Sequence, residues 1–213
     1  MIESPIYPLR AEPAKSRSNL YRLFSALYLR EVSPDVLKTL KSREVSAVFE
    51  ELDSDIVRLV SNAKEEDLLN DLAEEYAALF IVPGGIPPYE SVRLEGQLYQ
   101  KSALEVEEFY KKCGLLIRDD FTLFPDHIGM EFEFMGYLAD KEAGSLINNT
   151  GDEAEKWLEL QMEFFEGHIS RWTFKFLQDM EKCAFHPFYK GLAELTQRFL
   201  ETEKEFFMEI ANN

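Results

Sequence analysis

Residues 125–143 read PDHIGMEFEFMGYLADKEA, and this stretch decides the fold class. Pro125 and the two residues after it mark the start of a helix that ends near Ala143. A helix that is apolar on every side is buried. The predicted helix is apolar nearly all round, through Ile128, Met130, Phe132, Phe134, Met135, Tyr137 and Leu138.

The sequence on both sides of this buried helix is also helical. Alternating β-branched strands, hairpin dipeptides and repeats of fixed period are all missing. We therefore predict an all-α, single-domain helical bundle of roughly eight to ten helices. Apolar residues recur at helical spacing from Ser16 onward, with short helices over 35–62 and longer ones over 65–82, about 94–113, about 153–181 and about 187–211.

Two proline-containing segments interrupt the helical pattern. Residues 1–15 contain three prolines and little periodicity, which predicts an irregular N-terminal arm before a helical domain over 16–213. The sequence PGGIPPYES over 83–91 is a strong loop signal. It predicts a boundary between an N-terminal and a C-terminal half, and a hinge there would allow a homodimer by domain exchange.

The charge balance limits the classes of partner. Lys and Arg total 23 against 40 Asp and Glu, so the net charge is −17. Such a surface repels nucleic acid and anionic lipid and attracts cationic partners, although acidic charge also simply keeps a protein soluble. We expect no nucleic-acid partner.

Cellular location is indicated by the cysteines and by the missing apolar segments. Cys113 and Cys183 form no Cys-x-x-Cys pattern, which speaks against a disulfide framework and fits a reducing compartment. The N-terminus lacks the apolar core of a signal peptide, and no apolar run approaches the roughly twenty residues of a membrane span. We expect a cytoplasmic protein that does not insert into a membrane.

Motifs that would indicate catalysis are missing. The sequence contains no His-Glu-x-x-His zinc motif, no Glu-x-x-His pair of a di-iron bundle, no Walker A loop and no Gly-x-Ser-x-Gly elbow. We therefore predict that the chain is not an enzyme and holds no metal or cofactor of its own.

A polar cluster stands at the start of the buried helix. Asp126 in the position of an N-cap would accept amide protons of the first turn, which would leave His127 without a role. His127 and Glu131 are four residues apart and share a helix face, where they could pair. Glu131 and Glu133 lie among apolar residues, so their carboxylates must reach solvent, a partner or a cleft. A polar cleft floor is one hypothesis, and a metal-dependent hydrolase built on Asp126, His127, Glu131 and His168 is the alternative from another class.

Three other motifs each allow an ordinary structural interpretation. The spacing of Tyr76, Leu79 and Phe80 is that of helix core residues. The run 87–91, PPYES, is a rigid turn or the rim of a peptide-binding cleft. His168 and Trp172 lie one turn apart on a long amphipathic helix, where core packing is the ordinary expectation.

In combination and in this order, these motifs resemble the TorD/DmsD family of redox enzyme maturation proteins. The resemblance covers about residues 72–176, and its most specific part is the Pro-Asp-His-Ile-Gly block. The motifs are Tyr76-x-x-Leu79-Phe80, Pro88-Tyr89-Glu90-Ser91, Pro125-Asp126-His127-Ile128-Gly129-x-Glu131-Phe132-x-Phe134-Met135 and His168-x-x-x-Trp172. Tyr89 stands where many relatives carry tryptophan.

The resemblance implies an all-helical cytoplasmic assembly chaperone. Such a protein binds the twin-arginine signal peptide (the leader) and the apo-catalytic subunit of a molybdopterin oxidoreductase, and holds them until the cofactor is inserted. A helical scaffold that binds folded proteins without leader specificity is a further alternative. The predicted client-binding residues are Tyr76, Leu79, Phe80, Pro87, Pro88, Tyr89, Glu90, Ser91, Asp126, His127 and Glu131.

Overall fold

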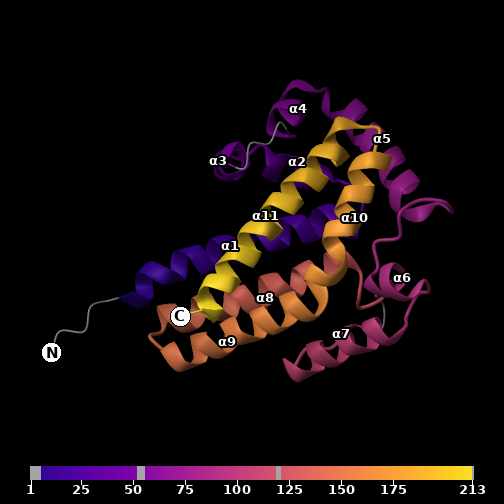
Figure 1. Cartoon of the computed structure of the whole chain (residues 1–213). Helices are drawn as coiled ribbons and strands as arrows, with labels where there is room; N and C mark the ends of the chain where they lie inside the picture. Colours follow the sequence, from indigo (N-terminus) through magenta and orange to yellow (C-terminus); the bar gives the residue numbers. More distant parts are fainter. Residues whose placement is uncertain (1–5, 52–55, 119–120, 213) are drawn as a thin grey trace. The chain divides into compact units, whose positions relative to one another are not determined.

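The computed structural model describes residues 6–51, 56–118 and 121–212, and no strand occurs among them. The all-α prediction is confirmed (Figure 1). The elements are α1 (Ile6–Leu29), α2 (Pro34–Leu40), α3 (Arg43–Glu51), α4 (Ile56–Asn62), α5 (Glu65–Tyr76), the π-helix η1 (Ala77–Ile81), α6 (Glu90–Glu95), α7 (Lys101–Lys112), α8 (Ile128–Ile147), α9 (Gly151–Phe164), the π-helix η2 (Phe165–Ile169), α10 (Ser170–Cys183) and α11 (Pro187–Ala211).

These elements belong to two compact units. Unit 1 contains the chain up to Ser25 and Tyr89–Arg171, and unit 2 contains Ala26–Pro88 and Trp172–Asn213. One boundary, between Pro88 and Tyr89, falls inside the predicted hinge. The other two fall within α1 and α10. The predicted loop thus coincides with one of the three boundaries between the units, and long helices carry the chain across the other two without any turn signal.

Unit 1 is built around α8, which is buried as the sequence predicts. Helices α8 and α9 lie side by side (Figure 1). The Phe134 ring is the centre of an aromatic cluster, with its centroid 4.6 Å from that of Tyr110 and 4.7 Å from that of Phe164. Edge-to-face and tilted ring contacts at these separations add to the free energy gained from burial.

The first part of α1 packs closely on α8. The Ser18 hydroxyl donates to the Gly136 carbonyl oxygen over 2.8 Å. A Cβ at Gly136 would lie 2.9 Å from Arg22 Cγ and 3.2 Å from the Ser18 carbonyl oxygen. Glycine therefore permits an approach of the two helices that any larger residue would obstruct.

The prediction of an irregular N-terminal arm is wrong over residues 6–15, because α1 begins at Ile6. Residues 1–5 of the predicted arm lie outside the described residues. Pro8 lies in the first helical turn, where no backbone amide is needed as a donor. Pro13 lies inside the helix and removes one hydrogen bond. Burial of Ala11 and Ala14 offsets that loss, in a small cluster with Ala143, Leu146 and Ala154.

Two other helix predictions need correction. The helix predicted to begin near residue 94 begins at Lys101 as α7, because α6 ends at Glu95 and a turn with positive φ at Gly96 and Tyr99 follows it. The predicted loop after Ala143 begins later, because α8 continues to Ile147. The long helix predicted over 153–181 is confirmed, since α9, η2 and α10 follow one another without a break. Among the described residues, no helix is both long and apolar enough to cross a membrane.

Candidate functional site

Three of the predicted client-binding residues are interior residues of unit 2. Tyr76 and Leu79 are buried, and Phe80 is half-buried. The Tyr76 hydroxyl donates to the Tyr28 carbonyl oxygen over 3.0 Å. The Phe80 ring stacks against Phe176 at 6.2 Å. The side chains of this motif therefore stabilise unit 2.

Within unit 1, the Tyr89–Ser91 segment meets Asp126 and His127. Tyr89 and His127 form an isolated antiparallel β-bridge. The Glu90 amide donates to the Asp126 carbonyl oxygen over 3.0 Å. Asp126 Oδ2 accepts from both the amide and the hydroxyl of Ser91, at 2.8 and 2.5 Å. Two motifs that are far apart in the sequence are thus joined into one structure, which we call the Tyr89–His127 junction.

Asp126 is not the N-cap of α8. That position belongs to His127, whose Nδ1 accepts from the Gly129 amide over 3.1 Å. The predicted cap and the view of His127 as a residue without a role are both wrong, because Ser91 takes up the Asp126 carboxylate. Since Nδ1 is an acceptor here, the neutral ring carries its proton on Nε2. Burial lowers the pKa of His127 to about 3, so the ring is neutral at physiological pH.

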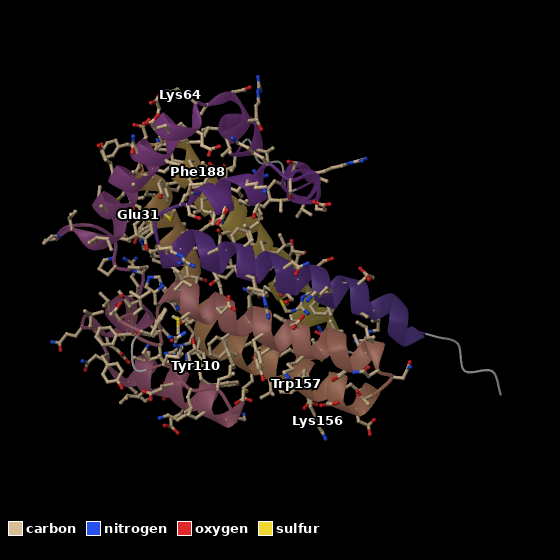
Figure 2. The ribbon with its side chains drawn as sticks, turned by 180° about the vertical axis from the view of Figure 1, so that it is seen from behind. Glu31, Lys64, Tyr110, Lys156, Trp157 and Phe188 are labelled. Carbon is tan, nitrogen blue, oxygen red and sulfur yellow. The ribbon has the colours of Figure 1, made fainter. Side chains whose placement is uncertain are left out.

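Buried carboxylates surround Tyr110, which Figure 2 labels on α7. Asp126, Glu131 and Glu90 are all fully buried. Burial, followed by the charges of Glu131, Asp126 and Glu90, raises the pKa of Tyr110 well above its usual range. The Tyr110 hydroxyl donates to the Pro125 carbonyl oxygen over 2.9 Å, which ties α7 to the Tyr89–His127 junction.

Glu90 is paired inside unit 1. Its Oε2 lies 2.8 Å from His168 Nδ1, and its Oε1 lies 3.4 Å from a guanidinium nitrogen of Arg171. Its carboxylate is therefore held by two residues of the η2–α10 region, whereas the sequence analysis includes Glu90 among the predicted client-binding residues.

A row of aromatic rings continues from this junction to the surface. Tyr89 contacts His127 at 5.0 Å and Phe124 at 6.0 Å, and Phe124 contacts Tyr99 at 5.3 Å. Tyr89 and Phe124 are half-buried and Tyr99 is exposed. We call Tyr89, Phe124 and Tyr99 the aromatic row.

Sequence reasoning missed Tyr99 and Phe124 as site residues. Tyr99 has φ of 54°, a left-handed conformation that is costly for an aromatic residue. Its hydroxyl donates to Glu107 over 3.0 Å. The sequence pattern predicts a helix over about 94–113, which places Tyr99 in a regular element. The turn-forming Gly96 is the signal that would have placed it in a loop.

Unit 1 also contains an apolar groove of about 300 Å³ beside α8. Its floor includes Met130, Phe134 and Tyr137, which share one face of the helix. Leu116 and Phe121 at its edge are 81% and 42% exposed. The exposed Glu133 also lines the groove, whereas Glu131 is buried. The other lining residues are Tyr110, Leu115, Ile117 and Arg118. Tyr89 does not line this groove.

The metal-dependent hydrolase alternative requires histidine and carboxylate side chains that converge on one point. Within the ranges that the structure describes, no group of three or more His, Cys, Asp or Glu side chains is arranged to hold a metal ion. Asp126 Oδ2 and His127 Nδ1 are instead engaged by Ser91 and Gly129.

Comparisons with known proteins agree with this architecture. A crystal structure described as that of a redox enzyme maturation protein from Archaeoglobus fulgidus matches with a TM-score of 0.57 at 24% identity, covering 87% of this chain and 93% of that one. The chaperone protein TorD of Shewanella oneidensis is 24% identical over 93% of each chain. That of Shewanella loihica is 28% identical over 90% of this chain and 92% of its own.

The family assignment follows from a match to a family model over more than half of the chain. The resemblance to TorD proteins is confirmed, and with it the prediction of a maturation chaperone rather than an enzyme. The model of the family described as nitrate reductase delta subunit matches residues 40–178. The chain belongs to the nitrate reductase delta subunit family, which includes the TorD chaperones.

Proposed function

We propose that this chain is a cytoplasmic assembly chaperone that binds the twin-arginine leader and the apo-catalytic subunit of a molybdopterin oxidoreductase until the cofactor is inserted. The molybdenum cofactor belongs to the client. The observation that carries the proposal is the aromatic row. Its rings reach the surface of unit 1 while their inner end is fixed by the Tyr89–His127 junction.

The apolar part of the leader supplies most of the affinity in this proposal. Burying about 400 Å² of apolar surface contributes on the order of 10 kcal/mol, at about 25 cal/mol per Å². Ordering a disordered peptide costs about 2–5 kcal/mol of this. The aromatic row and the groove beside Met130 are the surfaces of unit 1 that we assign to this contact.

The cationic part of the leader is recognised through the charge of the whole chain. A net charge of −17 attracts two adjacent arginines and raises the association rate. An exposed arginine–carboxylate pair contributes only roughly 0–1 kcal/mol and is screened by salt. Charge therefore selects and steers the peptide, and apolar contact retains it.

The test is a calorimetric titration of the Tyr89→Ala variant with a twin-arginine leader peptide. Loss of the ring lowers affinity by roughly ten- to a hundredfold, because a central aromatic anchor is removed. Phe206→Ala is the matched control, since Phe206 is a half-buried aromatic residue of unit 2, and we expect its affinity to equal that of the wild type.

Equal affinity of Tyr89→Ala and wild type would remove the aromatic row from the leader site. The same titration with the two arginines replaced by lysines separates a leader-specific chaperone from a general scaffold. Arginine offers a planar fork of donors that lysine lacks, so we expect the lysine peptide to bind more weakly. No leader affinity at all, with an intact fold, would favour the scaffold.

A further inference from the structure

Glu90 is a fully buried carboxylate directly next to Tyr89 in the sequence. We infer that His168 and Arg171 are positioning residues of the client site: they hold Glu90 and thereby fix the Tyr89–Ser91 segment on which the aromatic row stands. This inference rests on the proposed function. It also assigns to Glu90 a role inside the protein rather than a contact with the cationic leader.

A buried histidine holds the Glu90 carboxylate. His168 is 6% exposed, and its Nδ1 lies 2.8 Å from Glu90 Oε2. The His168 ring is held from the side by Phe164 and Phe109, whose ring centroids lie at 4.9 and 6.3 Å. The imidazole thus has a fixed orientation, as a group that positions another side chain requires.

Both partners of Glu90 lie where the π-helix η2 meets α10. His168 lies in η2, a π-helical turn, and Arg171 lies three residues later on the same helix face. The Arg171 guanidinium donates to the Gly167 carbonyl oxygen over 3.0 Å as well as to Glu90 over 3.4 Å. π-Helical turns within longer helices are frequent at functional positions. His168 and Arg171 contact the same carboxylate from this turn and from the start of α10.

The backbone at Glu90 belongs to the Tyr89–His127 junction. The Glu90 amide donates to the Asp126 carbonyl oxygen, and Ser91 donates twice to the Asp126 carboxylate. The backbone of Glu90 and Ser91 therefore forms part of the Tyr89–His127 junction. The Glu90 side chain is fixed by its contact with His168. A buried carboxylate that loses its partner is strongly destabilising and tends to move toward water. Such a movement would displace Tyr89, the adjacent residue.

The first experiment needs no leader. Hydrogen exchange of the Glu90 and Ser91 amides is compared between the wild type and His168→Leu, which keeps an apolar side chain between the Phe109 and Phe164 rings. We expect faster exchange at these two amides and unchanged exchange in α11 of unit 2. His168→Asn restores the protection, because its amide nitrogen can donate from a position close to that of Nδ1.

The second experiment is a double-mutant cycle on leader affinity. His168→Leu lowers the affinity by roughly tenfold in the wild-type background and causes no further loss in the Tyr89→Ala background, since it acts through Tyr89. His186→Leu is the matched control. His186 caps α11 in unit 2 by accepting from the Phe188 amide, so its loss weakens the fold without touching the junction.

Different results contradict the two proposals. Unchanged exchange at Glu90 and Ser91 in His168→Leu overturns the positioning role, as does an equal, additive loss of affinity in both backgrounds. A loss of leader affinity in His186→Leu as large as that in His168→Leu also overturns it, because general destabilisation would then explain both. If exchange at Glu90 and Ser91 is faster in His168→Leu than in the wild type, but the wild type binds no leader, only the proposed function is contradicted.

Discussion

At the scale of single residues, adjacent side chains at the start of α8 perform different tasks. The sequence identifies Asp126 and His127 as a polar pair at a helix start, and capping statistics favour the aspartate. The structure gives the cap to His127 and the aspartate to Ser91. Sequence alone could not predict this exchange, because Ser91 lies 35 positions away and competes for the carboxylate only after the chain has folded.

His127 makes the stability of the chain depend on pH. Burial lowers its pKa from 6.5 to about 3, so the unfolded chain binds one proton more than the folded chain between these two values. The free energy of unfolding therefore falls as the pH decreases through this window. Between pH 6.5 and about pH 5, His127 lowers the free energy of unfolding by about 2 kcal/mol, at about 1.36 kcal/mol per pH unit.

The measurement is urea unfolding of the wild type and of His127→Asn at about pH 7 and about pH 5. Asparagine keeps a capping acceptor but does not titrate. We expect the wild type to lose about 2 kcal/mol more than the variant between these pH values. Parallel losses in the two proteins would show that His127 is not held neutral by burial.

At the scale of elements, the helical periodicity in the sequence was sufficient to predict the helices but not all of their ends. The all-round apolar pattern of α8 required burial and was confirmed. The start of α1 was missed, because the burial of Ala11 and Ala14 is a tertiary effect that outweighs Pro13. The turn between α6 and α7 was missed because Tyr99 has a backbone conformation that aromatic residues rarely adopt.

Two glycines of α8 are predicted to respond in opposite directions to the same substitution. Gly136→Ala places a methyl group 2.9 Å from Arg22 Cγ, so α1 and α8 must separate. We expect a loss of about 1–3 kcal/mol of unfolding free energy. Among the described residues, and apart from the adjacent backbone of α8 itself, no atom lies within 4 Å of the ideal Cβ position of Gly144, so Gly144→Ala stabilises the helix by about 0.5–1 kcal/mol.

Urea unfolding of the two variants measures this difference, and each serves as the control for the other. Destabilisation by both substitutions, or by neither, would contradict the close approach of α1 and α8 at Gly136.

At the scale of the whole molecule, the motif set that indicates the family does not form one set of exposed contacts. Tyr76 and Leu79 belong to the interior of unit 2, whereas Tyr89 and the residues that fix it belong to unit 1. The sequence could therefore predict the family and the fold class. It could not separate the residues that stabilise a unit from those that reach the surface, because the family motifs contain residues of both kinds.

The central claim is that the apolar part of a twin-arginine leader lies on unit 1. It is tested most directly by photo-crosslinking a leader peptide that carries a diazirine side chain in its apolar segment to the full-length chain. Mass spectrometry then identifies the attachment sites. The account predicts attachment at the aromatic row and at the groove residues Leu116, Phe121 and Met130, reduced by excess unlabelled leader. Attachment confined to residues 26–88 and 172–213, the segments of unit 2, would contradict it.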